Sequence, residues 1–393
     1  MTGQPTTNPP IGIGIIGCGN VCEAYVRGMA SWLSVRIAAC ADQRHDAAAA
    51  MASKHGFAAV SVDSLLADPE VRIVLNLTVP TAHAEVSRAI ISAGKHVYSE
   101  KPMATSFADA LALVEAAAAR GVRIGCAPDT FMGGGHQASR QLIDSGQIGR
   151  IVGGAATMVS PGMERWHPNP AFFFQRGGGP ALDMGPYYIT QLVNLLGPVR
   201  RVAAIATRGF AARAVGSGPL AGTRIDVEVP TSLNGALEFV SGANVAVTLS
   251  WDVWKTTRLP LELYGENGTL RCPDPDYFGG VPSFSGRDGP WIDADISGWK
   301  FASENAVAGE RRVANYRGIG VIDMAAAIAA GRIHRANQAL GLHVLEVLDG
   351  LHQASECGKA IAIGTSCERP LPLVRQSPGA EIGDTSVCFG PVF

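Results

Sequence analysis

Residues 11–22 read Ile-Gly-Ile-Gly-Ile-Ile-Gly-Cys-Gly-Asn-Val-Cys, an apolar run that ends in a glycine-rich turn. The run predicts a buried strand at residues 11–16, and the residues from Val21 onward predict a helix. Between them, Gly17 would make the tight turn, and Gly19 would let the backbone approach a pyrophosphate at the helix N-terminus. This strand, turn and helix are typical of a dinucleotide-binding α/β domain.

The same glycines allow a second register. Gly12, Gly14 and Gly17 also fit the spacing G-x-G-x-x-G, but that motif must follow a strand and only Thr-Asn-Pro-Pro precedes it here. In the preferred register the third glycine is replaced by Cys22, a small residue that still permits close packing of helix on strand. Asn20 and Val21 then complete the turn where we expect the cofactor.

The first third of the chain alternates apolar runs with alanine-rich segments. Continuous apolar runs predict strands buried on both faces, as in a parallel sheet covered by helices. The predicted strands are residues 11–16, 35–41, 57–60, 73–77, 96–99 and 122–126. The predicted helices are residues 21–34, 46–55, 83–93 and 107–120. We therefore expect an N-terminal Rossmann domain, a doubly wound parallel sheet, over residues 1–130.

The second predicted strand ends at Asp42, where the carboxylate that binds the adenosine ribose belongs in such a domain. A carboxylate there accepts hydrogen bonds from the ribose and repels a 2′-phosphate, which favours NAD. Arg44 is close enough to leave NADP open. The alternative is an ordinary tight turn at Gly17 and Gly19, with Asp42 as the cap of the following helix.

After residue 150 the pattern changes to strands in succession, which predicts a second, α+β domain over residues 131–393 with a mostly antiparallel sheet. Predicted strands are residues 151–159, 199–207, 226–229, 236–239, 243–251 and 259–264, with a helix at about 181–196. Residues 273–297 are rich in Pro, Gly and Asp and predict an insertion or lid. A final helix at 338–358 precedes a polar tail.

Residues 94–102 read Gly-Lys-His-Val-Tyr-Ser-Glu-Lys-Pro and predict a short strand that delivers Lys101 to its carboxyl end. Pro102 disfavours the helical conformation for the residue before it, so Lys101 should be extended. Glu100 and Lys101 are neighbours on a strand, and their side chains should point to opposite faces. The ammonium of Lys101 is then left for another partner at the edge where ligands bind.

The second domain offers such a partner. Residues 177–187 read Gly-Gly-Gly-Pro-Ala-Leu-Asp-Met-Gly-Pro-Tyr, a triple glycine leading into a helix. Asp183 and Tyr187 are four residues apart and would share one helix face. Asp183 could equally cap the helix, and Tyr187 could simply be a packed aromatic residue.

These motifs together resemble the Gfo/Idh/MocA oxidoreductases, the glucose–fructose oxidoreductase and inositol dehydrogenase family, over about residues 11–350. The resemblance implies a nicotinamide cofactor and a sugar, cyclitol or related polyol bound on the open face of the C-terminal sheet. It maps the family's catalytic lysine to Lys101 and its helix aspartate to Asp183. The turn Thr78-x-Pro80-x-x-His83 and Glu100 join the candidates for cofactor binding, and His83 is also open to a purely structural role.

One position departs from the family pattern, since Tyr187 stands where a histidine is common. A free phenol has a pKa near 10 and is a poor base alone, but a neighbouring ammonium favours the phenolate. We therefore expect Tyr187 and Lys101 to act as a coupled proton-transfer pair oriented by Asp183.

The loop at residues 164–174 is rich in aromatic residues and precedes the triple glycine. Trp166 could stack on a sugar ring and His167 could make polar contacts, so both are candidate substrate-binding residues. The alternative is that these aromatic side chains pack between the two domains.

Composition limits the other function classes. The chain of 393 residues is 47% hydrophobic but only 17% charged, against a usual charged share of about 25%, which suggests surface buried between subunits. We expect a homodimer or homotetramer through the C-terminal sheet. The net charge of −2 gives no reason to expect a nucleic-acid or membrane partner. The eight cysteines lack metal or redox spacing, and with a polar N-terminus they predict free thiols, no metal and a cytoplasmic protein.

The leading hypothesis is an NAD(P)-dependent oxidoreductase acting on a secondary alcohol of a sugar, cyclitol or glycoside. A second enzyme class would keep NAD tightly bound and use transient oxidation for elimination, epimerisation or glycoside cleavage. A non-catalytic sensor of sugar or dinucleotide is the third alternative, and a sensor would not need Lys101 and Asp183.

Overall fold

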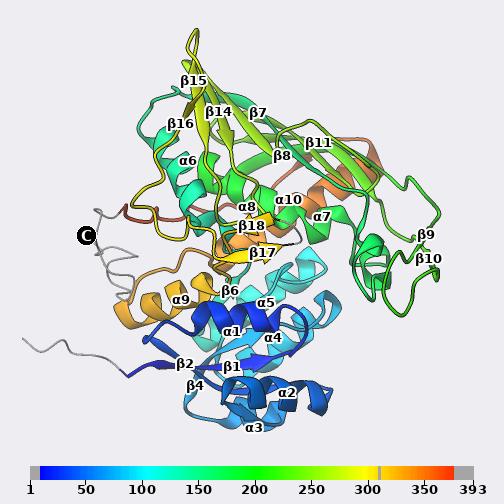
Figure 1. Ribbon diagram of the computed structural model, residues 1–393, viewed down its shortest axis with the longest axis vertical. Helices are drawn as coiled ribbons and strands as arrows, with labels where there is room; N and C mark the ends of the chain where they lie inside the picture. Colours follow the sequence, from blue (N-terminus) through cyan, green and yellow to red (C-terminus); the bar gives the residue numbers. More distant parts are fainter. Residues whose placement is uncertain (1–8, 309–310, 376–393) are drawn as a thin grey trace, which may run out of the picture.

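The computed structural model describes residues 9–308 and 311–375 and contains two large sheets, one above the other in Figure 1. The lower sheet belongs to the first third of the chain. The upper sheet is built from the remaining residues, and helices of both parts lie between them. The predicted fold class, a Rossmann sheet followed by an α+β part with a large and mostly antiparallel sheet, is confirmed.

The first sheet has six parallel strands in the order β3-β2-β1-β4-β5-β6. Its strands are β1 (Ile11–Ile16), β2 (Val35–Ala41), β3 (Ala58–Ala59), β4 (Val71–Asn76), β5 (His96–Ser99) and β6 (Ile124–Cys126). Its helices are α1 (Cys22–Met29), α2 (His45–His55), α3 (Val62–Ala67), α4 (His83–Ser92) and α5 (Phe107–Arg120). β1 is buried throughout, as its uninterrupted apolar sequence predicts.

The second sheet has nine strands in the order β16-β15-β14-β13-β7-β12-β11-β8-β19. They are β7 (Ile151–Val159), β8 (Val199–Thr207), β11 (Ser232–Phe239), β12 (Asn244–Ser250), β13 (Leu261–Gly265), β14 (Gly268–Cys272), β15 (Ser283–Gly286), β16 (Ile292–Asp293) and β19 (Ile361–Ala362). Among the described strands of this second sheet, only β7 and β12 pair in parallel, because the chain between them crosses over through a helix. Two small hairpins, β9 (Ala212–Ala214) with β10 (Arg224–Asp226) and β17 (Ala306–Ala308) with β18 (Arg311–Val313), lie outside this sheet.

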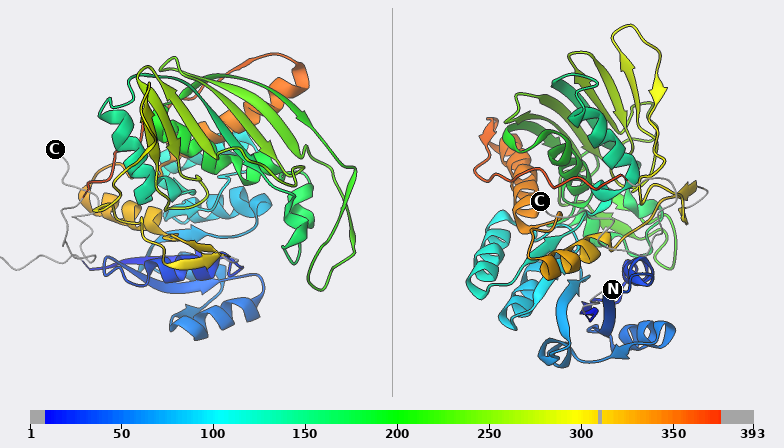
Figure 2. Two further views of the ribbon diagram at one scale, coloured as in Figure 1. Left: turned by 45° about the horizontal axis from the view of Figure 1, so that its top comes forward. Right: turned by 90° about the vertical axis from the view of Figure 1, so that its left-hand side faces the viewer.

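Helices cover one face of the second sheet. α8 (Gly185–Leu196) and α10 (Gln338–Cys357) pack against it, and every residue of α8 is buried (Figure 2). α6 (Gly134–Asp144) packs beside α8. The strands alternate buried and exposed residues, so the opposite face is open, as in β8 and β12.

The chain returns to the first sheet near its end. α9 (Ile319–Ala330), which the sequence did not lead us to expect, packs against α1 and β6, and α10 packs against α5 and β6. His334 Nε2 lies 3.0 Å from the carbonyl oxygen of Ile124, and Asn337 forms a β-bridge with Gly125. The segment just before α9 contacts both parts of the chain, because Arg317 hydrogen-bonds to Glu100 and to Tyr187.

Three predictions about the second part need correction. The strand expected at 226–229 lies instead at β10, which ends at Asp226 and pairs with β9 outside the nine-stranded sheet. The single helix expected at 181–196 is broken at Met184 into α7 (Pro180–Asp183) and α8, with Pro186 in the first turn of α8, where its missing amide donor costs no helical hydrogen bond. Residues 273–297 are not simply an inserted lid, since they contain β15 and β16, which extend the sheet at its edge. The boundary near residue 130 remains a prediction.

Seven cysteines lie in the described part of the chain, all as free thiols, and Cys388 lies outside it. Within residues 9–308 and 311–375, no helix has the length and hydropathy needed to cross a bilayer. The same residues contain no group of three or more His, Cys, Asp or Glu side chains placed to hold a metal ion. Residues 1–8 and 376–393, which include most of the predicted polar tail, are not described.

Candidate active site

The turn after β1 has the backbone shape that the sequence predicts. Gly17 has φ +101°, and a Cβ there would lie 2.6 Å from the backbone of Leu77, so only glycine fits. Nothing lies within 4 Å of a Cβ placed on Gly19, so the backbone there faces open space. Cys22 is fully buried at the start of α1, as its small size allows.

Asp42 lies beside this turn at the end of β2. Its Oδ2 accepts a hydrogen bond from the amide of Cys18 at 2.7 Å, and its Oδ1 accepts one from the amide of Arg44 at 2.8 Å. Asp42 thus holds two turns and is partly exposed, while the side chains of Arg44 and Asn20 are exposed. An open glycine turn at a helix N-terminus, with a partly exposed carboxylate at the next strand end, fits a dinucleotide.

The loops after β4 and β5 are joined through a buried histidine. His83 Nδ1 lies 2.7 Å from the carbonyl oxygen of Pro102, and Nε2 lies 3.0 Å from that of Thr78. Thr78 Oγ1 donates to Asn76 Oδ1 at 2.7 Å, and Pro80 is partly buried at the start of the next short helix. The contacts of His83 are therefore structural, and they fix the segment that carries Lys101.

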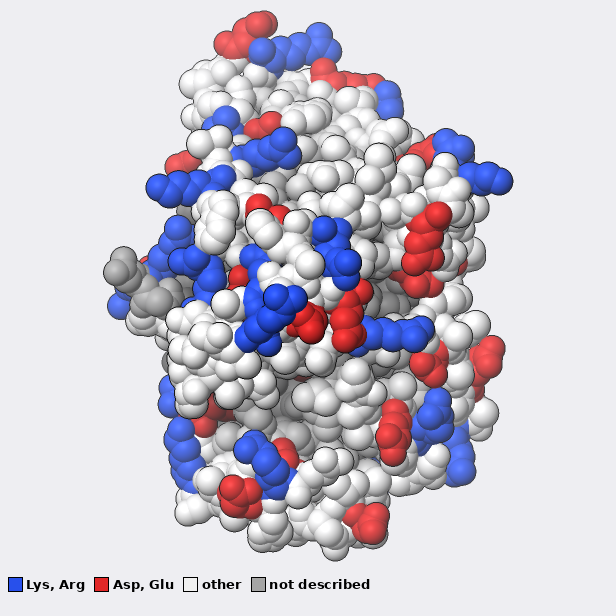
Figure 3. Space-filling model, turned by 90° about the vertical axis from the view of Figure 1, so that its right-hand side faces the viewer, with Lys and Arg blue, Asp and Glu red and all other residues white. Residues whose placement is uncertain are grey.

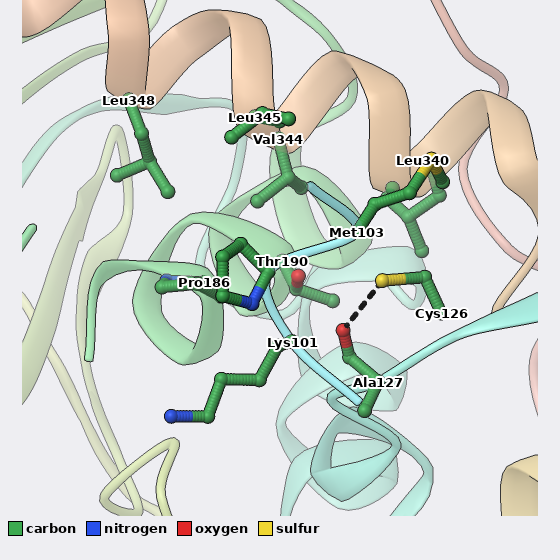
Figure 4. Close-up of a pocket in the computed structure, with 12 residues that line it drawn as sticks. Lys101, Met103, Cys126, Ala127, Pro186, Thr190, Leu340, Val344, Leu345 and Leu348 are labelled. Carbon is green, nitrogen blue, oxygen red and sulfur yellow. Dashed lines mark hydrogen bonds between the residues drawn. The ribbon is translucent and has the colours of Figure 1, made fainter. Parts of the chain in front are cut away.

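The side chain of Lys101 is directed away from the apolar side chains of α10 (Figure 4). Its Nζ donates to Asp183 Oδ1 at 2.7 Å and to the Asp183 carbonyl oxygen at 2.7 Å. The side chains of Lys101 and Asp183 are 14% and 16% exposed, so the pair is not sealed from a substrate. The break between α7 and α8 does not prevent the contact between Lys101 and Asp183, because Asp183 is the last residue of α7.

The charge state of Lys101 follows from this pairing. Burial alone would lower its pKa, but Asp183, together with Tyr187 and Glu100, outweighs burial and raises the pKa above the ordinary value of a lysine. Lys101 therefore remains an ammonium at neutral pH. It can donate a hydrogen bond or a proton to a substrate oxygen, but it is a poor base.

Tyr187 is buried beside Lys101, whose Nζ lies 5.2 Å from the centre of the phenol ring. The cation at the hydroxyl itself is a different one, since Arg317 Nη2 donates to Tyr187 Oη at 3.3 Å. Arg317 Nη1 also pairs with Glu100 Oε1 at 2.8 Å. Sequence reasoning missed Arg317, because it lies 217 residues from Glu100 and outside every motif.

A second residue that sequence reasoning missed is Asp276, in the loop between β14 and β15. Asp274 fixes this loop by accepting hydrogen bonds from Tyr188 Oη at 2.9 Å and from the amide of Asp276 at 3.1 Å. Burial and then Asp274 raise the pKa of Asp276 to about 6, while Arg317 and Lys101 act in the opposite direction. Asp276 is therefore a partly buried carboxylate within electrostatic reach of the Lys101–Asp183 pair.

The aromatic loop lies at the edge of this arrangement. Trp166 is 63% exposed, and His167 packs edge-on against Phe172 and Phe173. His167 Nδ1 accepts a hydrogen bond from the amide of Asn169 at 3.1 Å. Phe173 in turn packs edge-on against Trp251. Much of this loop therefore packs within the second part of the chain, while Trp166 projects outwards, and the substrate-binding roles of Trp166 and His167 stay predictions.

Family models match both parts of the chain. Residues 11–127 match the model described as oxidoreductase family, NAD-binding Rossmann fold. Residues 136–271 match the GFO/IDH/MocA C-terminal domain. The chain belongs to the Gfo/Idh/MocA oxidoreductase family. It is therefore an enzyme of the oxidoreductase class with NAD as its cofactor, and the residues of the glycine turn fit that cofactor.

Relatives within the Gfo/Idh/MocA family include a reductase and a dehydrogenase. 1,5-Anhydro-D-fructose reductase of Ensifer adhaerens is 29% identical over 230 residues, which cover 57% of this chain and 68% of the relative. Inositol 2-dehydrogenase of Gluconacetobacter diazotrophicus is 35% identical over 149 residues, which cover 36% of this chain and 44% of the relative. The second alignment thus spans less than half of that relative.

Solved structures support the same fold over a longer span. The apo form of levoglucosan dehydrogenase matches with a TM-score of 0.78 at 20% identity, covering 92% of this chain and 100% of that one. An NAD-binding oxidoreductase from Klebsiella pneumoniae matches with a TM-score of 0.77 at 23% identity, covering 91% and 100%. At these sequence identities the similarity shows the fold alone.

Proposed function

We propose that this Gfo/Idh/MocA protein transfers a hydride between NAD and a secondary alcohol of a sugar, cyclitol or glycoside. The observation that carries the proposal is the 2.7 Å contact between Lys101 Nζ and Asp183 Oδ1 at the carboxyl end of β5, beside the Tyr187 phenol. Ligands bind at that edge of a doubly wound sheet. The relatives named as a sugar reductase and an inositol dehydrogenase support the substrate class.

The charges around Lys101 favour a neutral substrate. Lys101 is paired with Asp183 and Arg317 with Glu100, so the two cations of this region are already compensated. Asp276 adds a further carboxylate. A phosphate or carboxylate group would therefore be repelled here, whereas hydroxyl groups could donate to Asp276 and accept from Lys101.

Each residue then has a chemical role in the proposed reaction. Gly17, Gly19 and the first amides of α1 hold the pyrophosphate, and Asp42 holds the adenosine ribose. The Lys101 ammonium donates to the reacting oxygen, and Tyr187 Oη exchanges the hydroxyl proton of the substrate. Hydride passes to or from the nicotinamide ring when the dinucleotide is bound. Asp183 keeps Lys101 charged and in place.

A screen with purified protein tests this proposal. Sugars, cyclitols and glycosides, together with sugar acids and sugar phosphates, are each incubated with NAD and with NADP while reduced nicotinamide is followed by absorbance. We expect reduction of NAD with at least one neutral compound and weaker use of NADP, because Asp42 repels a 2′-phosphate. Product formation without net NADH would point instead to transient oxidation, and binding without any turnover would point to a sensor.

We also propose that a second copy of the chain covers the open face of the nine-stranded sheet. Ala203, Ala236, Ala246 and Ala155 are paired across the neighbouring strands β8, β11, β12 and β7, and they form a row of small side chains on that face. Ile205 on the same face is 72% exposed. The row is bordered by charges that are paired with one another, Arg201 with Glu238 and Arg271 with Glu262. A strip of small apolar side chains with compensated charges beside it suits self-association.

A further inference from the structure

Arg317 contacts the candidate site although it belongs to none of the sequence motifs that predicted that site. It lies between β18 and α9, in the segment that returns to the first sheet. Its guanidinium bridges two groups, with Nη1 2.8 Å from Glu100 Oε1 and Nη2 3.3 Å from Tyr187 Oη. Its side chain is 17% exposed. The guanidinium therefore joins the strand end that carries Lys101 to the helix that carries Tyr187.

Glu100, which accepts a hydrogen bond from the Arg317 guanidinium, is held in place by two further hydrogen bonds. Glu100 Oε1 also accepts a hydrogen bond from Tyr25 Oη at 2.9 Å, and Oε2 accepts one from the amide of Lys101 at 3.0 Å. Although burial would raise the pKa of Glu100, Arg317 and Lys101 hold it below its usual value. Glu100 is therefore a carboxylate that fixes one edge of the guanidinium.

The backbone of Arg317 is also fixed. The amides of Gly318 and Gly320 both donate to Asp129 Oδ2 at 3.0 Å. On the other side, a Cβ on Gly28 of α1 would lie 1.8 Å from the Arg317 carbonyl oxygen, so the close approach of α1 requires glycine there. The arginine is thus held between the cofactor-binding helix and the start of α9, and its side chain points at the phenol.

The two cations near Tyr187 act on different parts of it. Lys101 lies 5.2 Å from the ring centre, whereas Arg317 contacts the oxygen that would carry the negative charge. Burial raises the pKa of Tyr187 above the usual value of a phenol, and the carboxylates of Asp276 and Glu100 act in the same direction. The positive charges of Arg317 and then Lys101 limit that rise. A cation at the oxygen stabilises the phenolate relative to the phenol.

The geometry points to Arg317 as the positioning residue that enables Tyr187 Oη to exchange the substrate proton. Because its pKa is raised, Tyr187 is a phenol at neutral pH. In the reduction direction its O–H bond breaks and an O–H bond forms on the substrate oxygen as that substrate accepts hydride, and Arg317 stabilises the phenolate that is left. In the oxidation direction the substrate O–H bond breaks and the proton returns to that phenolate while hydride leaves for the nicotinamide. The guanidinium keeps its own protons throughout. This inference rests on the proposed function, although the coupling between Arg317 and Tyr187 can be measured without a substrate.

The test follows the ionisation of Tyr187 by NMR in protein with isotope-labelled tyrosine, with Tyr187→Phe identifying the resonance. We expect Tyr187 to lose its proton at a pH lower by about one unit or more in the wild type than in Arg317→Met. Arg140→Met is the matched control, because Arg140 is also buried, pairs with Asp144 and donates to the Asn194 carbonyl oxygen of the same helix α8. It should lower thermal stability and leave the pKa of Tyr187 unchanged.

A second variant covers the case in which Arg317→Met does not fold. Arg317→Lys keeps a cation for Glu100 but loses the planar fork that reaches both partners, so it should fold and give Tyr187 a pKa above that of the wild type. The inference would be overturned if the pKa of Tyr187 in the folded Arg317 variants were equal to or below its pKa in the wild type.

Turnover separates the inference from the proposed function. With a substrate found in the screen, Arg317→Lys should have a pH profile of kcat/KM that is shifted towards alkaline pH relative to the wild type. Adding Arg317→Lys to Tyr187→Phe should cause no such shift. An unchanged profile alongside a shifted NMR pKa would overturn the role in proton transfer while leaving the oxidoreductase assignment intact. Failure of the wild type to reduce NAD with any compound would count against the proposed function, whatever the NMR result.

Discussion

Asp276 follows Pro275 and precedes Tyr277 in a loop sequence that does not suggest burial, yet its carboxylate is partly buried in the folded protein. Its pKa is raised from 3.8 to about 6, with burial as the largest cause. The folded protein therefore binds the Asp276 proton more tightly than the unfolded chain does. Above pH 6 the ionised carboxylate lowers stability, and this penalty is relieved as the pH falls from about 6 towards 4.

Asp276→Asn removes this penalty and should stabilise the protein at pH 7.5 by roughly 1–3 kcal/mol. The gain should shrink as the pH falls through 6, because wild-type Asp276 is then protonated as well. Thermal unfolding from pH 4 to 8 measures this. Asp288→Asn, at an exposed position between β15 and β16, serves as the control and should show no such trend. A constant difference across the pH range would contradict the assignment.

The turn between β1 and α1 offers a contrast between two glycines, Gly17 and Gly19, which are two residues apart. Gly17→Ala should lower stability by more than about 2 kcal/mol, because φ is +101° and the new methyl group would meet the backbone of Leu77. Gly19→Ala should leave the melting temperature unchanged, since its methyl group would face open space. It should nevertheless weaken NADH binding about tenfold or more by occupying the place of the pyrophosphate.

Fluorescence titration with NADH and a thermal melt of both variants measure these effects. If Gly19→Ala bound NADH as tightly as the wild type, the turn would be an ordinary one and the cofactor would lie elsewhere. The pair thus distinguishes the cofactor-binding turn from the simple tight turn that the sequence alone left open.

Local patterns predicted the elements of the first sheet well. β1, β2 and β5 begin and end where their apolar runs do, because strands buried on both faces need an uninterrupted apolar sequence. The Lys101–Asp183 meeting was also predictable, since each residue lies in a recognisable motif. In contrast, α9 has a nearly featureless apolar sequence, and β15 and β16 are short edge strands among Pro, Gly and Asp.

Arg317 and Asp276 could not be predicted as site residues for a related reason. Each joins the site only because the chain returns to the first sheet through α9 or folds back after β14. The contact between Arg317 and Glu100 spans 217 residues, and no periodicity or spacing reports a contact of that range. Tyr187 could thus be predicted as a proton-transfer residue, but the cation at its hydroxyl could not.

Over the molecular surface, charges of both signs are interspersed among large uncharged areas on the face shown in Figure 3. The open sheet face adds the row of alanines that runs across four strands. We expect the protein to self-associate through that face by apolar contact, because surface charge supplies little long-range attraction.

Ala246→Arg places a charged side chain in the middle of the alanine row and should shift the protein towards the monomer. Ala50→Arg, on an exposed position of α2, is the control and should keep the wild-type mass. Light scattering after size-exclusion chromatography measures both. An unchanged oligomer in Ala246→Arg would contradict association through the open face, and a monomeric wild type would exclude it.

Lys101 is central to the proposed chemistry, because it is the ammonium that acts on the reacting oxygen. The decisive measurement is kcat of Lys101→Met with a substrate from the screen, alongside the NADH affinity of the same variant. We predict that kcat falls by about 10²–10⁴-fold while NADH binding changes little. A Lys101→Met variant that binds NADH and turns over at the wild-type rate would contradict this role of Lys101.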